Sequence, residues 1–247
     1  DVFTERGKMW TRLLTQEVHR HLTPCAPVTF GSNYMPWAGG QACAEELESQ
    51  VYSAREGAFL PSIKIPGYNY AEKHYAEHHQ KHPDWVIYGS ETGSHLQSRG
   101  VYHFPMDVHI LSEEDLQCSS LLNSLTSWGT QNLPAMLTED LKTPYSMGQF
   151  IWAGIDYIGE PTPYHTRNCY FGQADTACFP KDSYFFYQAM WTDRPMIHIG
   201  AVWDWNENQR IDVPVMTNGA WAELYVNGVS LGRKRVDRRD PALCLPR

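Results

Sequence analysis

The stretch Trp85–Glu91, WVIYGSE, decides the fold, and it continues into the polar segment Thr92–Tyr102, TGSHLQSRGVY. Its apolar, β-branched and aromatic residues predict a buried strand that ends in a carboxylate, Glu91. In a parallel sheet or a βα-barrel, the carboxyl ends of the strands face the active site. We therefore expect Glu91 to point toward a substrate, unless it is simply solvated or pairs with a basic neighbour such as Arg99.

Helical and strand patterns alternate on both sides of this strand. We expect strands at 28–33, 62–70, 85–91 and 149–155, helices at 1–22, 41–55, 71–82 and 181–191, and helical character within 111–141. This alternation is typical of βα units around a parallel sheet, and a complete TIM barrel needs about eight strands. The pattern therefore predicts an α/β fold that contains about the second half of a TIM (β/α)8 barrel.

After Pro195 the pattern becomes all-β. Short apolar runs at 196–205, 213–217 and 221–226 are separated by turn signals such as Asn218-Gly219 and Asn227-Gly228. A complete immunoglobulin-like sandwich has about seven strands, so only part of one is visible. We therefore expect a domain boundary near Pro195, with the barrel part at 1–194 and the start of a β-sandwich domain at 195–247.

Charge and composition limit the possible partners. The formal charge is −8 and Lys and Arg form no basic block, which argues against nucleic acid as a partner. No run of about 18 apolar residues occurs, so we expect no membrane span. The six cysteines form no CxxC pair, and free thiols are favoured over a bridge between Cys169 and Cys178. The compartment stays open between cytoplasm and periplasm.

Three histidines recur every four residues along the helix expected at 71–82, at His74, His78 and His82. Two histidines at this spacing can bind a metal ion. However, no carboxylate motif of the metalloprotease kind accompanies them. We therefore expect a solvated helix face, and neither a metal nor another cofactor.

Candidate binding residues lie at the other strand ends. Tyr68, Asn69 and Tyr70 can donate hydrogen bonds to sugar hydroxyls or to a nucleophile, or they can pack in the core. Trp152 offers a flat ring on which a sugar can stack, although a core position would explain it equally well. Asp156 can orient a sugar hydroxyl, or it can make a structural loop contact.

Several motifs occur in an order that resembles a known family. They are GYNYAEKHYAEHHQKHPD (67–84), IYGSETGSHLQSRGVYHFP (87–105), QFIWAGIDYIGEPTPY (149–164), NCYFGQADTACFPKDSYFFYQAMWT (168–192) and VPVMTNGAWAELYVNGVSLGR (213–233). Together they are similar to β-galactosidases of glycoside hydrolase family 2, especially the gut-bacterial branch. The resemblance covers nearly the whole chain.

The resemblance implies a TIM-barrel catalytic domain whose nucleophile, at the end of the seventh strand, falls on Glu91. The sugar-stacking Trp of the family falls on Trp152, and its polar aromatic cluster falls on Tyr68-Asn69-Tyr70. Asn33 ends the expected fifth strand and is a further candidate for the substrate pocket.

The implied reaction is hydrolysis of terminal β-D-galactosides with retention of configuration. Activity on β-glucuronides or β-mannosides, within the same family, is left open. So is a non-catalytic, carbohydrate-binding role.

One motif departs from the family pattern. The acid/base Glu of the family belongs to an Asn-Glu pair that should precede the first helix of this chain, but Asp1–Arg6 contains none. The pair Asn206-Glu207 lies in the β part. We therefore expect the acid/base to come from an upstream part of a longer enzyme. Taken alone, the chain would then need this missing N-terminal half as a partner, or would associate with itself.

Overall fold

The computed structural model describes residues 5–22, 28–32, 65–112, 115, 117–120, 123–125, 133–200 and 202–240. The chain forms two compact units, one from 1–92 with 142–150 and the other from 93–141 with 151–247. The helix expected at 41–55 lies outside the described residues, as does Asn33. Neither unit begins or ends near Pro195. The boundary expected there between a barrel part and a β-sandwich domain stays a prediction.

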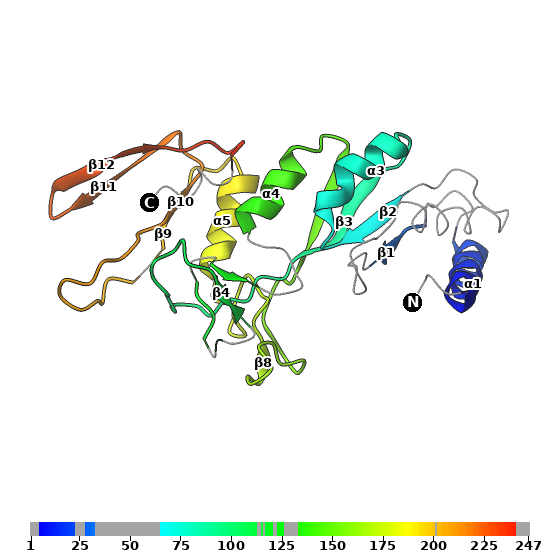
Figure 1. The fold of residues 1–247 in the computed structure, drawn as a ribbon, viewed down its shortest axis with the longest axis horizontal. Coiled ribbons are helices and arrows are strands. Elements are labelled where there is room, and N and C mark those ends of the chain that lie inside the picture. Colours follow the sequence, from blue (N-terminus) through cyan, green and yellow to red (C-terminus); the bar gives the residue numbers. More distant parts are fainter. Residues whose placement is uncertain are drawn as a thin grey trace. The chain divides into compact units, whose positions relative to one another are not determined.

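A sheet with the strand order β1-β2-β3-β6 organises the first unit. Its strands are β1 Phe30–Ser32, β2 Pro66–Asn69, β3 Ile87–Gly93 and β6 Ser146–Trp152. β2 pairs in parallel with both β1 and β3 (Figure 1). Parallel strands need a crossover, which η1 Glu72–His74 and α3 Tyr75–Lys81 supply between β2 and β3. This is an α/β arrangement, and its closure into part of a barrel stays a prediction.

The core of the first unit forms where α3 lies along β2 and β3 (Figure 1). Its buried members are Tyr68, Ala71, Tyr75, Trp85 and Ile87. Burial of these aromatic rings is the main stabilising term for the crossover, because each large ring removes about 150–250 Å² from water.

The expected N-terminal helix is present as α1, Glu5–His21. Its apolar side chains Met9, Trp10, Leu13 and Leu14 are exposed.

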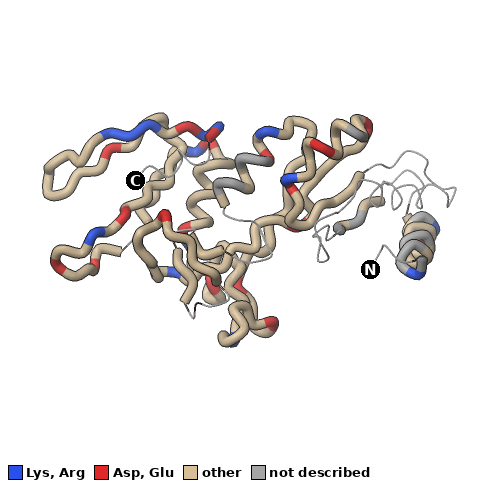
Figure 2. Tube along the Cα trace, in the orientation of Figure 1, with Lys and Arg blue, Asp and Glu red and all other residues tan. Residues whose placement is uncertain are grey.

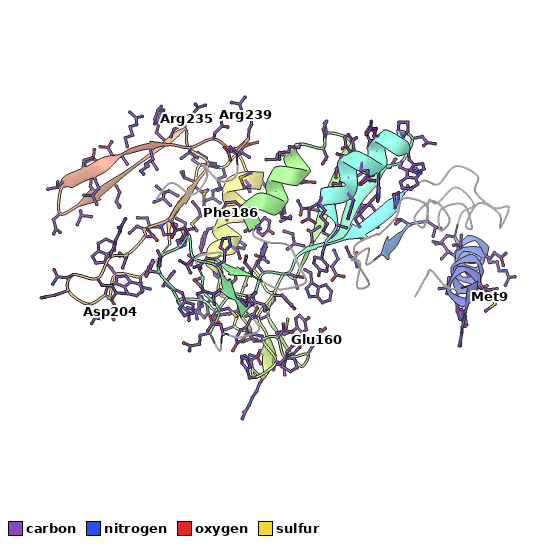
Figure 3. All side chains as sticks on the ribbon, in the orientation of Figure 1. Met9, Glu160, Phe186, Asp204, Arg235 and Arg239 are labelled. Carbon is purple, nitrogen blue, oxygen red and sulfur yellow. The ribbon has the colours of Figure 1, made fainter. Side chains whose placement is uncertain are left out.

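The described residues of the second unit include two α-helices and four short strand pairs. The helices are α4 Leu133–Leu141 and α5 Asp182–Trp191. The parallel pair is β4 Ile110–Leu111 with β5 Ser124–Leu125, and the antiparallel pairs are β7 Tyr157–Ile158 with β8 Asn168–Cys169, β9 Ile197–Ile199 with β10 Val215–Thr217, and β11 Trp221–Val226 with β12 Val229–Arg235. Phe186 of α5 is buried in the main core (Figure 3).

The helical character expected within 111–141 is wrong at its beginning, where β4 and β5 occur instead. Buried polar side chains explain the difference, because they bond the backbone in place of helical hydrogen bonds. Ser124 Oγ accepts from the amide of Ser119 at 2.8 Å. The Asn123 amide donates to the carbonyls of His103 at 3.1 Å and Val108 at 3.0 Å. Leu133–Leu141 forms the one α-helix among the described residues of this stretch.

Surface features of the described residues bear on the earlier expectations. None of the helices there is long and apolar enough to cross a membrane. Basic side chains gather along β12, where Arg233, Lys234 and Arg235 follow one another (Figure 2). Cys169 and Cys178 are free thiols, as expected.

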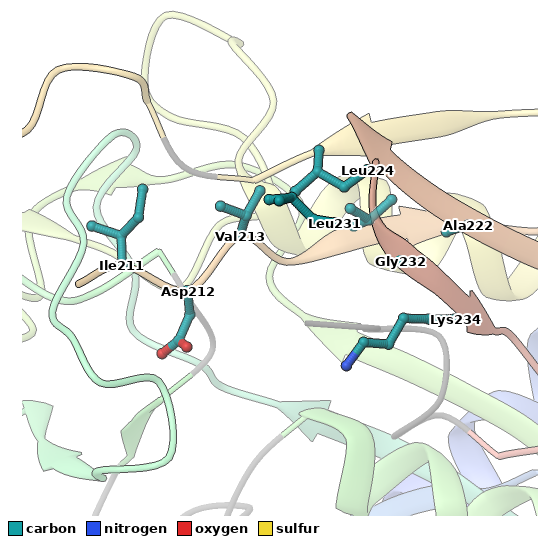
Figure 4. A pocket seen from close by; sticks show the side chains of 9 residues that line it. Ile211, Asp212, Val213, Ala222, Leu224, Leu231, Gly232 and Lys234 are labelled. Atoms are coloured by element: carbon teal, nitrogen blue, oxygen red, sulfur yellow. The ribbon is translucent and has the colours of Figure 1, made fainter. Parts of the chain in front are cut away.

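A cavity of about 210 Å³ lies at the β11–β12 hairpin (Figure 4). Its walls are mainly aliphatic, and Asp212 and Lys234 are its charged members. The Asp212 carboxylate accepts a hydrogen bond from the amide of Met106 at 2.8 Å. This aspartate therefore serves a structural contact, and the cavity walls offer little chemistry.

Candidate active site

Glu91 lies in the second half of β3, where the strand changes from fully buried to half-buried. Gly89 is required just before it, because a Cβ there would lie 2.5 Å from the Thr92 Cγ2 atom. Beyond Glu91, the Thr92 hydroxyl donates to the Gln149 side-chain oxygen of β6 at 2.7 Å. The strand is therefore held on both sides of the glutamate, whose side chain stays partly open to solvent.

A register shift brings the end of β2 opposite Glu91. Tyr68 pairs with Gly89, but the next residue, Asn69, pairs with Glu91, so Ser90 is an extra residue in β3. The amide of Tyr70 then donates to the Glu91 carbonyl at 2.9 Å. Irregularities of this kind re-aim side chains and are frequent next to active sites.

Each oxygen of the Glu91 carboxylate accepts a hydrogen bond. The Tyr70 hydroxyl donates to Oε1, and the Asn69 amide nitrogen donates to Oε2 at 3.4 Å. Tyr70 has a φ of 54°, in the left-handed region. Such a conformation costs of order 1–3 kcal/mol for a bulky residue and is common at functional sites. The two donors fix the orientation of the carboxylate.

Tyr68 faces away from this group. It is buried, its hydroxyl pairs with Nδ1 of His78 at 2.8 Å, and its ring meets the Tyr75 ring edge-on at 5.0 Å. Among the described residues of the polar aromatic cluster, Asn69 and Tyr70 are the members that contact Glu91.

The solvated face expected for the helix histidines is wrong at its centre. His78 is buried and bonded to Tyr68, and the ring of His74 stacks on His78 at 5.6 Å. Burial lowers the pKa of the His74 imidazole. Within the part of the chain that the structure describes, no cluster of three metal-ligating side chains occurs.

Trp152 ends β6 and belongs to the second unit. Its side chain is 37% exposed, and its ring meets that of Tyr157 edge-on at 6.2 Å. Its carbonyl accepts from the amide of Ser94 at 2.9 Å, and the Trp152–Ala153 peptide bond is cis. Tyr157 in turn donates to Glu160 at 2.7 Å, in the exposed β7–β8 loop (Figure 3).

Asp156 is buried and forms an ion pair with Lys181, whose ammonium lies 2.7 Å away. The Lys181 ammonium also donates to the carbonyls of Gln97 and Tyr170 at 2.7 and 3.1 Å. The amide of Gly172 donates to the same Asp156 oxygen at 2.8 Å. Burial raises the pKa of the Asp156 carboxyl and lowers that of the Lys181 ammonium, although each charge counteracts the shift of the other. These contacts make Asp156 a structural carboxylate of the second unit.

His95 follows Glu91 by four residues and lies in the second unit. It is 4% exposed, and its Nε2 has no hydrogen-bond partner among the described residues. Burial lowers the pKa of its imidazole to about 4. Neither His95 nor Lys181 stood out in the sequence, because neither lies in a periodic or clustered pattern.

Two curated proteins are similar to this chain. Beta-galactosidase BoGH2A of Bacteroides ovatus is 35% identical in an alignment of 229 residues that covers 87% of this chain and 25% of that protein. A putative beta-glucuronidase of Formosa agariphila is 41% identical in an alignment of 100 residues that covers 38% of this chain and 10% of that protein. The chain thus spans about a quarter or less of the length of these relatives.

Solved structures and a family model agree with this similarity. A beta-glycosidase from Bacteroides vulgatus has a TM-score of 0.65 at 22% identity, over 92% of this chain and 34% of its own. A glycosyl hydrolase family 2 member from Bacteroides cellulosilyticus has a TM-score of 0.59 at 19% identity, over 98% of this chain and 29% of its own. The model described as "Domain of unknown function (DUF4982)" matches residues 208–244.

The curated relatives that this chain resembles are named as glycosidases. Over most of its length the chain is similar to one of them, in agreement with the glycoside hydrolase family 2 motifs of its sequence.

Proposed function

We propose that this chain supplies the nucleophile side of a retaining β-glycosidase, with Glu91 as the nucleophile. The observation that carries the proposal is the Glu91 carboxylate in the second half of the parallel strand β3, which runs two residues past it, with Tyr70 and Asn69 each donating to one oxygen. Donors on both oxygens hold the carboxylate in one orientation. This lowers the entropic cost of reaching a productive geometry with the sugar.

In the first step, a Glu91 oxygen forms a bond to the anomeric carbon and the bond from that carbon to the leaving-group oxygen breaks. The leaving group takes the bonding electron pair and needs a proton from an acid unless it is already a weak base. A water molecule then attacks the same carbon and gives a proton to the group that served as the acid, the bond to Glu91 breaks, and the carboxylate is restored. The acid/base would come from outside residues 1–247.

The proposed substrate class is terminal β-D-galactosides. The similarity to a beta-galactosidase over most of the chain supports this choice. Trp152 is the proposed stacking surface for the sugar, supported by its flat and partly exposed ring.

β-Glucuronides are the second candidate, because a relative named as a putative beta-glucuronidase matches 100 residues at 41% identity. A glucuronide carboxylate would need cationic or amide groups to hold it. The sequence has no clear cluster of such groups near the strand ends.

Covalent labelling tests the proposal. The reagent is 2,4-dinitrophenyl 2-deoxy-2-fluoro-β-D-galactoside, whose leaving group departs without acid assistance. Intact mass and peptide mapping should show one sugar on Glu91. The glucuronic acid counterpart of the reagent, used alongside, separates the two substrate classes.

Two results would change the proposal. A label from the glucuronic acid reagent alone would replace the galactoside by the second candidate. No label from either reagent, in a sample that circular dichroism shows to be folded, would contradict the catalytic role. The chain would then be at most a carbohydrate-binding segment.

A further inference from the structure

Ser90 and Glu91 are consecutive in β3, and their side chains both reach Asn69. In a regular strand, consecutive side chains point to opposite faces. Here Ser90 is the extra residue of the register shift. Its hydroxyl donates to Asn69 Oδ1 at 2.6 Å, while Asn69 Nδ2 donates to Glu91 Oε2 at 3.4 Å. The irregular register therefore lets one amide bridge two neighbouring residues.

The bridge has a defined direction. An asparagine amide has a donor end and an acceptor end, and an ionised carboxylate is acceptor-only. The reversed amide would place its oxygen against the Glu91 carboxylate, so two acceptors would face each other. With Ser90 donating to the amide oxygen, the amide nitrogen is turned toward Glu91.

Gly31 of β1 leaves the space in which this pair sits. A Cβ at that position would lie 3.1 Å from the Ser90 hydroxyl oxygen and 3.2 Å from Asn69 Oδ1. Both distances are shorter than ordinary van der Waals contact, so a side chain there would press directly on the Ser90–Asn69 hydrogen bond.

We propose that Ser90, with the space left by Gly31, is a positioning residue that orients the Asn69 amide on the nucleophile. The functional part of this inference rests on the proposed role of Glu91. Ser90 acts through Asn69 and does not itself touch the sugar. Loss of its hydroxyl would leave the Asn69 side chain free to rotate away from the Glu91 carboxylate.

The test compares Ser90→Ala with Ser90→Thr, which keeps a hydroxyl, and with Gly31→Ala. Ser230→Ala, an exposed serine of β12, is the control. The first readout is hydrogen exchange of the Asn69 side-chain amide by ¹⁵N NMR, assigned by its loss in Asn69→Asp. The second readout is the rate constant and the dissociation constant for labelling of Glu91 by the fluorogalactoside.

We expect Ser90→Ala to accelerate amide exchange and to slow labelling by about 3- to 10-fold, the range for one hydrogen bond. The reagent's dissociation constant should stay unchanged. Ser90→Thr should show the amide exchange rate and the labelling rate constant of the unaltered chain. Gly31→Ala should resemble Ser90→Ala, although it keeps the Ser90 hydroxyl. Circular dichroism checks that each variant is folded, and Gly31→Ala carries the test if Ser90→Ala does not fold.

Unchanged amide exchange in both Ser90→Ala and Gly31→Ala would overturn the inference, as would equal losses in Ser90→Ala and Ser90→Thr. If amide exchange responds as expected but the unaltered chain takes no label, the positioning contact stands and the proposed function fails. The two failures are therefore distinguishable.

Discussion

Glu91 and Asp156 are both carboxylates associated with apolar strands, but their surroundings differ. Glu91 lies within β3, is half-buried, and accepts hydrogen bonds from two uncharged donors. Asp156 follows β6 by four residues, is buried, and pairs with the Lys181 ammonium. A buried ion pair serves structure, whereas a half-open carboxylate with neutral donors can meet a substrate. Position near a strand end therefore does not by itself identify a catalytic carboxylate.

Replacing Glu91 should have the largest effect on chemistry and little effect on folding. Glu91→Gln keeps the shape but removes the carboxylate proposed as the nucleophile, so labelling by the fluorogalactoside should be abolished. Glu207→Gln, an exposed substitution in the β part, is the matched control and should be labelled normally. Mass spectrometry measures both. A label retained elsewhere in Glu91→Gln would transfer the nucleophile role to another residue.

Replacing Asp156 should have the opposite profile. Asp156→Asn leaves the buried Lys181 ammonium without its counter-charge, which typically destabilises by about 3–5 kcal/mol. Urea denaturation measures the loss, with exposed Asp204→Asn as the control. Pairing Asp156→Leu with Lys181→Met should recover much of it. A loss below about 1 kcal/mol for Asp156→Asn would contradict the structural role of the ion pair.

His95 sharpens the comparison, because it is buried and pairs with no charged group in the part of the chain that the structure describes. Its folded-state pKa of about 4 lies below the ordinary value of 6.5, so its contribution to stability is present above pH 6.5 and is lost as the pH falls toward 4. The loss is about 3 kcal/mol. Comparing denaturation of the unaltered chain and His95→Gln from pH 7 to 4 measures it, with exposed His109→Gln as the control. Equal pH slopes in the unaltered chain and His95→Gln would contradict this prediction.

Tyr70→Phe tests one donor to Glu91. A hydrogen bond to a charged group is worth about 1.5–3 kcal/mol, so labelling should slow by about 10- to 150-fold while Glu91 stays the labelled residue. Exposed Tyr164→Phe is the control. Labelling kinetics at several reagent concentrations separate this change in rate from a change in binding. An unaltered rate constant would mean that Asn69 alone is sufficient to hold the carboxylate.

The sequence predicted the main elements around the site, because each is encoded locally. The apolar run before Glu91 became β3, and the polar residues at the end of β2 came beside it. The sequence did not show which of Tyr68 and Tyr70 contacts Glu91, because the packing of Tyr68 against Tyr75 of the crossover helix is a tertiary contact.

The contacts that decide the role of Asp156 were also hidden. Its partner Lys181 is 25 residues away in the sequence, beyond the antiparallel β7–β8 pair. The helical pattern after Leu111 failed for a related reason. Buried Ser and Asn side chains took over backbone hydrogen bonds there, which hydrophobic periodicity cannot report.

The extra residue in β3 has a consequence for engineering and for alignment. Side chains along a strand alternate between the two faces of the sheet. The extra residue Ser90 shifts this alternation by one for the residues of β3 that follow it. If this strand were grafted onto a regular sheet, the Glu91 side chain would point to the wrong face. A sequence alignment that omits the extra residue Ser90 would assign Glu91 to the wrong face in the same way. Deletion of Ser90 would therefore move the side chains that follow it to the opposite faces of the sheet, which no substitution at a neighbouring position can correct.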